Sequence, residues 1–144
     1  MGRSTRTGDL RVTAFTVDHG DAIKPAYGYR IDYRGRAAVV SGDTRYNENI
    51  VRYAQGADLL IHEVAMARKA LLGEPHIQRI VSHHTTPQEA GLVFTRAKPK
   101  LAVFTHLVLL ASETISAPSV EQSHCGDPRD LQWASRGRRG SDGL

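Results

Sequence analysis

Short apolar runs, separated by turn residues, fill the first two-thirds of the chain. Several runs alternate apolar and polar positions and are rich in β-branched and aromatic residues, a pattern that predicts β-strands. The later runs are short and continuously apolar, as in buried strands. The expected strands span residues 10–17, 27–33, 36–41, 58–62 and 101–105. A turn at Arg34-Gly35 joins the second and third strands as a hairpin.

Two segments between these strands predict helices. Asn47 is a suitable N-cap for residues 48–55, and Gly56 follows as a typical C-terminal residue. Thr86, Pro87 and Glu89 predict a capping box with proline in the first turn of a helix over residues 87–97. Since helices alternate with apolar strands from residue 36 onward, we expect a layered α/β fold.

The composition changes near residue 110. Residues 111–144 are rich in Ser, Gly, Arg, Asp and Pro and have no sustained apolar period, so we expect a disordered or non-native tail. Residues 1–9 are expected to be a flexible lead, and residues 10–110 form the folded body. The absence of a long apolar run or a secretory signal, together with the single cysteine Cys125, predicts a cytoplasmic protein that does not cross a membrane.

The net charge of +4 is concentrated in residues 1–110, where 15 Lys and Arg residues stand against 10 Asp and Glu residues. This balance suits an anionic substrate or a nucleic acid, and it is also common on ordinary protein surfaces. Aromatic residues make up 6% of the chain and do not interleave with the basic ones. That pattern argues against a single-stranded nucleic-acid binder, which needs stacking platforms.

Residues that can bind metals or transfer protons follow the predicted strands. In open α/β sheets the carboxyl ends of strands line the ligand crevice, so these side chains are expected to converge. Imidazole and carboxylate groups are ligands for zinc-like ions. Singly, each residue also has an ordinary role in a turn or cap, and we assign such roles to His62, His76, His83 and His124. The candidate set is His19, Asp43, Glu63, His84 and His106.

The motifs VDHG, KPAYGYRIDYRGRAAVVSGDT, DLLIHEV, HHTTPQEAG and LAVFTHL occur in that order over residues 10–110. Together they resemble the C-terminal half of a metallo-β-lactamase-fold hydrolase, of the ribonuclease Z-like and arylsulfatase-like branch. The resemblance implies half of an αββα sandwich, a mixed sheet with flanking helices. It also implies hydrolysis of a phosphodiester or another anionic ester by a metal-activated water.

The resemblance also assigns roles to the candidate residues. His19, Asp43 and His106 match metal ligands, and Asp43 matches the aspartate that bridges two ions. Glu63 and His84 match a catalytic pair that assists protonation of the leaving group. The complete family site holds two zinc ions, with manganese as an alternative.

The chain lacks the family's HxHxDH motif, which supplies most ligands to both metals. We therefore expect the site to be incomplete in this chain. Half a sandwich also leaves one apolar sheet face uncovered, so a second chain or a second copy is an expected partner.

The expected substrate is a small anionic ester or a nucleic acid. Only ten residues separate Arg30 from Ser41, which leaves no room for the long arm typical of transfer-RNA-processing members. The sequence after His106 also lacks their HFSxRY ending. Two alternatives stay open: a ribonuclease Z-type RNA 3′-processing endonuclease, and a non-catalytic half-domain that pairs with another chain.

Overall fold

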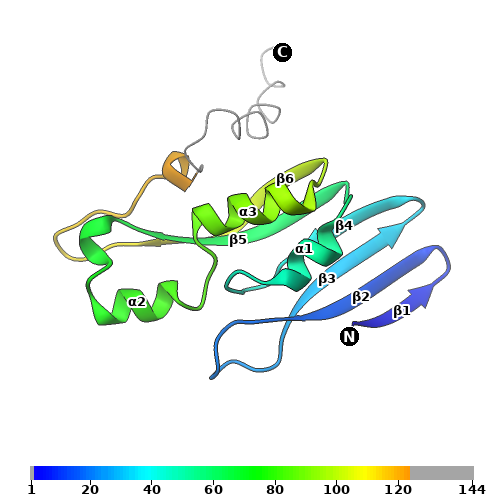
Figure 1. Ribbon diagram of the computed structural model, residues 1–144, viewed down its shortest axis with the longest axis horizontal. Helices are drawn as coiled ribbons and strands as arrows, with labels where there is room; N and C mark the ends of the chain where they lie inside the picture. The colour runs from blue at the N-terminus through cyan, green and yellow to red at the C-terminus, as the bar shows by residue number, and fades with distance from the viewer. Residues whose placement is uncertain (1, 124–144) are drawn as a thin grey trace, which may run out of the picture.

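The strands form one mixed sheet with the order β1-β2-β3-β4-β5-β6 in the computed structural model, which describes residues 2–123 (Figure 1). The first four strands are antiparallel neighbours, and β4, β5 and β6 run parallel to one another. The strands are β1 (Arg3–Thr7), β2 (Leu10–Val17), β3 (Ala26–Tyr33), β4 (Arg36–Val40), β5 (Leu59–Ala67) and β6 (Leu101–Leu110).

Two helices lie over one face of this sheet: α1 (Glu48–Ala54) over β2 to β4 and α3 (Pro87–Ala97) over β5. A third helix, α2 (Pro75–Val81), contacts β5. Two 3₁₀ turns lie at Lys69–Leu71 and Val120–Ser123. The expected α/β fold class, a mixed sheet with flanking helices, is confirmed.

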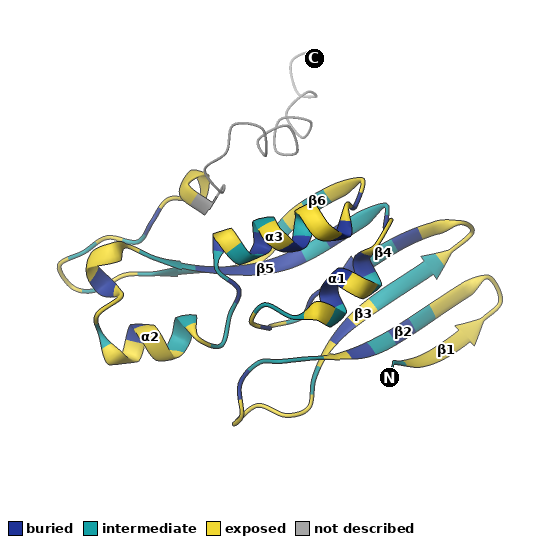
Figure 2. Cartoon of the chain, in the orientation of Figure 1, coloured by how far each residue is buried: buried dark blue, intermediate teal, exposed yellow. Residues whose placement is uncertain are grey.

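The core lies between the sheet and the helices α1 and α3. Phe15, which is 1% exposed, stacks on Tyr53 with 4.3 Å between ring centroids. Its ring also packs against Gly28, where an added Cβ would lie only 2.6 Å from the ring. Buried positions recur along α1, α3 and β5, which enclose this core, whereas β1 is exposed (Figure 2).

Both expected helix caps are present. The Asn47 side chain accepts a hydrogen bond from the Asn49 backbone N–H, and α1 ends just before Gly56. Thr86 and Glu89 form the reciprocal capping box, with Pro87 in the first turn of α3. The cap fixes where α3 begins, directly after His84 and Thr85.

Replacing Thr86 with alanine should lower the free energy of unfolding by about 1 kcal/mol, because the cap satisfies a backbone N–H that otherwise has no partner in the helix. Urea unfolding at one fixed protein concentration measures the change. Thr95→Ala, at an exposed position of α3, is the matched control and should shift stability by less than about 0.5 kcal/mol. Equal losses in the two variants would contradict the role of the cap.

The structure differs from the sequence expectations at several places. Residues 3–7 form β1 where the sequence predicts a flexible lead, because an edge strand pairs through its backbone and needs no apolar side chains; Ser4 Oγ also lies 2.7 Å from Thr13 Oγ1. Strands β5 and β6 both continue about five residues past the predicted ends, since they pair with each other there.

Only part of the expected tail belongs to the described residues. Arg68 donates hydrogen bonds to the backbone carbonyls of Ser116 and Ala117, and Pro118 is buried. Residues 124–144, with Cys125 and His124, lie outside the described residues. Among residues 2–123, every helix is too short or too polar to span a membrane.

Candidate active site

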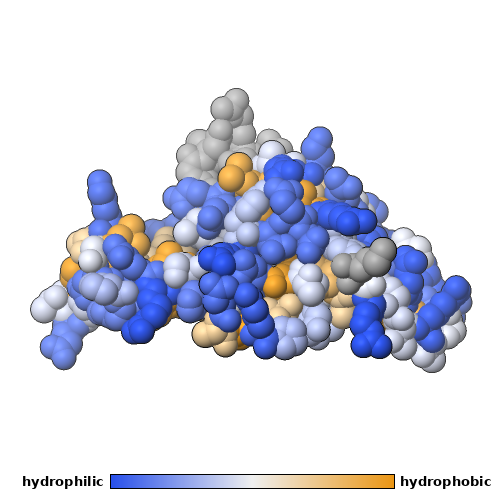
Figure 3. Space-filling model, turned by 60° about the horizontal axis from the view of Figure 1, so that its bottom comes forward, coloured by the Kyte–Doolittle hydropathy of each residue, from blue (hydrophilic) through white to orange (hydrophobic). Residues whose placement is uncertain are grey.

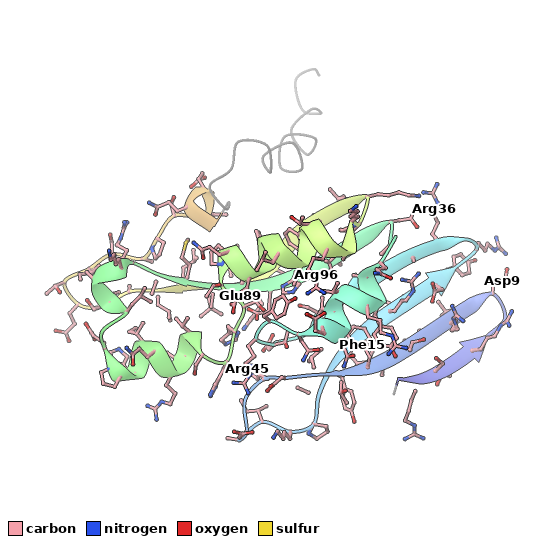
Figure 4. The ribbon with its side chains drawn as sticks, viewed as in Figure 1. Asp9, Phe15, Arg36, Arg45, Glu89 and Arg96 are labelled. Atoms are coloured by element: carbon pink, nitrogen blue, oxygen red, sulfur yellow. The ribbon has the colours of Figure 1, made fainter. Side chains whose placement is uncertain are left out.

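The candidate residues gather near the carboxyl ends of β2 and β4, beside Glu63 and His106, which lie within the longer strands β5 and β6. Strands β2, β4, β5 and β6 all point the same way. Arg45 lies toward the carboxyl ends of β2 and β4, while Asp9 and Arg36 mark the hairpin turns at the opposite end (Figure 4). The convergence follows from strand direction, as expected for an open α/β sheet.

Asp43 lies in the loop that follows β4, and the backbone conformation of Gly42 determines the position of Asp43. Gly42 has φ +64°, and a Cβ there would collide with the Tyr27 carbonyl oxygen. Only glycine accepts both the backbone conformation and this close approach. The Asp43 carboxylate is half-exposed, and its Oδ2 lies 3.6 Å from His106 Nε2.

His106 reaches Asp43 because β6 is irregular at that residue. The register between β5 and β6 shifts after Glu63, which pairs with Thr105, so that Val64 pairs with Leu107 and His106 is the extra residue. Its φ is +44°, in the left-handed region. A bulge of this kind redirects a side chain out of the regular alternation, and bulges are frequent beside active sites.

Glu63, at the centre of the site, is 1% exposed and fully hydrogen-bonded. Its Oε1 accepts the backbone N–H groups of Thr85 at 2.7 Å and Thr44 at 3.4 Å. Its own backbone N–H donates to Ser41 Oγ at 3.0 Å. These donors hold a carboxylate away from water, which requires such compensation. Glu63 therefore has a fixed orientation.

The second oxygen of that carboxylate, Oε2, lies 3.2 Å from His84 Nδ1. The hydrogen bond that His84 donates to the Glu63 carboxylate raises the pKa of His84 above its usual value, and partial burial opposes this effect. An imidazole held in this way is a more basic proton carrier with a defined ring plane. The two side chains thus lie within hydrogen-bond distance, the arrangement that the family resemblance implies for this pair.

His19 completes the arrangement on the other side of His84. The ring centroids of His19 and His84 are 4.9 Å apart, and those of His84 and His106 are 5.6 Å apart. His19 Nδ1 lies 2.9 Å from the His83 carbonyl oxygen, so a proton on Nδ1 donates to that oxygen and leaves the lone pair of Nε2 to coordinate a metal ion. A backbone carbonyl behind one ring nitrogen is a common support for metal-binding histidines.

The candidate side chains provide some, but not all, of the ligands that a divalent ion needs. Two ligands that each lie about 2.1 Å from a tetrahedral ion are about 3.4 Å apart, close to the 3.6 Å between Asp43 and His106. No group of three or more His, Cys, Asp or Glu side chains among residues 2–123 is arranged to hold an ion. Asp43 and His106 are thus the best-placed pair, and His19 lies beyond His84, whose ring stands between the two other imidazoles.

Sequence reasoning missed the residues that hold Glu63. Ser41, Thr44 and Thr85 are buried, and each contacts either Glu63 or a neighbour of it; Thr85 Oγ1 donates to the Thr44 carbonyl at 2.7 Å. Thr44 and Thr85 directly follow Asp43 and His84 in the sequence, but no local pattern connects them with Glu63. His62 lies on the helix side of β5 beside Phe94, apart from the candidate set.

Comparisons with known proteins agree with this fold. The ribonuclease Z of Anoxybacillus flavithermus is 36% identical over 92 residues, which cover 64% of this chain and 28% of that protein. Human tRNase Z, short form, matches with a TM-score of 0.55 and 25% identity over 81% of this chain and 44% of that one. The metallo-β-lactamase fold protein YhfI from Bacillus subtilis matches with a TM-score of 0.59 and 21% identity, over 76% and 42%.

The chain therefore spans less than a third of the curated relative and less than half of each structure. The family described as Beta-lactamase superfamily domain matches residues 1–107, most of the described residues. The matched residues include all five candidate residues and the sheet up to residue 107 in β6. On this match and this fold, the chain belongs to the beta-lactamase superfamily domain family, with the metallo-β-lactamase fold.

Proposed function

We propose that this chain provides one part of the active site of a metal-dependent hydrolase that cleaves phosphodiesters or similar anionic esters. The observation that carries the proposal is the linked set of side chains from Asp43 through His106 and His84 to Glu63 and His19. It joins two kinds of group that such hydrolysis needs: ligands for a divalent ion and a proton carrier.

Asp43, His106 and His19 are the proposed metal ligands. A divalent ion bound there supplies Lewis acidity, which lowers the pKa of a water molecule and offsets negative charge on the substrate. Zinc suits the imidazole and carboxylate donors, and manganese is the alternative. In this proposal the complete site holds two ions, and further ligands come from outside this chain.

Glu63 and His84 are the proposed catalytic pair. Glu63 accepts the Nδ1–H of His84 and so fixes the plane of the ring, and in the protonated ring, which the raised pKa favours, Nε2 carries the second proton. His84 gives this proton to the leaving oxygen of the ester. Since Glu63 is buried and bound by two backbone N–H groups, it orients His84 without moving.

A phosphodiester is the favoured ester because the matched relative is a ribonuclease, whose substrate carries such bonds. The same likeness supports ribonuclease Z-type processing of RNA as a second candidate. The short connection between Arg30 and Ser41 argues against it. Assays with a chromogenic phosphodiester, a sulfate ester and an RNA hairpin separate these substrate classes.

Replacing Asp43 with alanine should reduce Zn²⁺ affinity at least tenfold, because it removes the carboxylate of the best-placed ligand pair. Dialysis followed by metal analysis, and titration calorimetry with Zn²⁺, measure the change. Any metal-dependent hydrolysis of bis(p-nitrophenyl) phosphate should fall by at least the same factor.

Asp21→Ala is the matched control, since Asp21 is an exposed aspartate paired with Lys24 outside the candidate set. This variant should bind Zn²⁺ as the parent chain does. Unchanged Zn²⁺ binding by Asp43→Ala, or equal losses in the two variants, would show that Asp43 is not a ligand.

A further inference from the structure

The face of the sheet opposite α1 and α3 has no covering element among the described residues. Residues paired across neighbouring strands share a face, and the sheet members of the core cluster (Phe15, Ala37, Val39 and Leu60) all lie on the helix side. The other side, which we call the open face, carries most of the exposed large apolar side chains: Leu10, Tyr27, Tyr29, Tyr33, Leu101 and Val103.

The open face is continuous across the sheet. Tyr29 of β3 pairs with Ala14 of β2 and Val40 of β4, and Val40 pairs with Ile61 of β5, which pairs with Val103 of β6. One apolar row thus crosses five strands. Tyr29 and Val103, near its two ends, are 42% and 39% exposed. A shallow hollow at the β1 side is lined by Val12, Ala14 and Tyr29, among others.

The face is also nearly free of charge. From β1 across to the Ile61–Val103 pair, two charged residues have side chains on the open face. They are Arg3, on the edge strand, and Arg36, at the start of β4. Arg36 already pairs with Asp58 at 3.2 Å. In the view of Figure 3 the surface is mainly hydrophilic, and apolar patches interrupt it. A partner for the open face must therefore be apolar, neutral and flat.

We propose that the open face binds the open face of a second copy of this chain, giving a symmetric dimer in which two sheets pack against each other. Two twisted sheets pack at about 10 Å, with apolar side chains interleaved between them. The centre of the face has no like charges to repel an identical face, although the whole chain carries +4.

The size of the face fits this partner. Six strands at about 4.8 Å spacing, with about six residues each at about 3.3 Å, give a flat area of about 500 Å² per copy. Two copies then bury about 1,000 Å², which is the lower size of a specific interface. This inference does not depend on the proposed function, because the interface needs neither metal nor ester.

Sedimentation equilibrium of the metal-free chain tests the proposal. We expect a defined species of twice the 15.8 kDa chain mass, with a dissociation constant in the micromolar range or below. Tyr29→Glu and Val103→Glu, each placing a charge in the apolar row, should weaken the dimer at least tenfold while circular dichroism shows an unchanged fold. Leu92→Glu is the matched control, because Leu92 is 56% exposed on α3, on the other side of the molecule.

Hydroxyl-radical footprinting of the unmodified chain keeps the test independent of how the variants fold. Oxidation of Tyr27, Tyr29 and Tyr33 should fall as protein concentration rises through the dissociation constant, while that of Leu92 stays constant. A monomer up to about 100 μM, a polydisperse aggregate, a dimer weakened equally by Leu92→Glu, or tyrosine oxidation that does not change with concentration would each overturn the proposal.

Discussion

Glu63→Ala should destabilise the folded chain by about 3–5 kcal/mol, because it removes one partner of a buried, hydrogen-bonded pair. The backbone N–H groups of Thr85 and Thr44 and the His84 imidazole would lose their shared acceptor in a place that is closed to water. An unsatisfied buried donor costs about 1–3 kcal/mol by itself. Urea unfolding at one fixed protein concentration measures the loss.

Glu63→Gln is the conservative control for this result. Glutamine keeps the shape and one carbonyl oxygen that can accept from Thr85, so the loss should be smaller, about 1–2 kcal/mol. It removes the negative charge that raises the pKa of His84. The His84 ring should then titrate at a lower pH, which NMR of the histidine ring protons detects. An unchanged His84 pKa would contradict the assigned pair.

The pH dependence of stability has a definite sign. Since the pKa of His84 is raised in the folded state, the charged pair stabilises the fold fully below about 6.5, the unfolded value, and this contribution is lost as pH rises through the folded value. The difference in unfolding free energy between the parent chain and Glu63→Gln should therefore narrow as pH rises through the folded-state pKa of His84. A difference that widens with rising pH would contradict the ion pair.

The elements that local rules govern were predicted well. The strand over residues 10–17 and the turn at Arg34-Gly35 match the structure, as do the helix caps at Asn47 and Thr86. Each depends on neighbours within a few residues, such as alternation, capping side chains or a turn. Strand direction then brings the five candidate residues together near the carboxyl ends of β2 and β4, although Glu63 and His106 lie within the longer β5 and β6.

Features that depend on distant pairing were not predictable. The exposed residues of β1 have no apolar pattern, and only pairing with β2 makes them a strand. The bulge at His106 exists because β5 and β6 remain paired past Glu63 with one extra residue in β6. The buried N–H groups that hold Glu63 come from loops more than 18 residues away, which no local pattern connects.

Gly42→Ala should both destabilise the chain and weaken the proposed Zn²⁺ binding, since the backbone at Gly42 also positions Asp43. A left-handed φ costs a non-glycine residue about 1–2 kcal/mol, and here the added Cβ also meets the Tyr27 carbonyl oxygen. The loop or β3 must shift to relieve this contact. We expect a total loss of about 3 kcal/mol or more, measured by urea unfolding, and a loss of Zn²⁺ affinity of at least tenfold by calorimetry.

Gly35→Ala separates the two causes. Gly35 has φ +76°, similar to Gly42, but an added Cβ there meets nothing within 4 Å. Its variant should therefore show only the conformational cost of about 1–2 kcal/mol and bind Zn²⁺ as the parent does. If Gly42→Ala behaves like Gly35→Ala in both measurements, the close approach of Gly42 to Tyr27 does not position Asp43. If only Gly42→Ala loses Zn²⁺, the packing of β3 against the loop after β4 determines where Asp43 lies relative to His106.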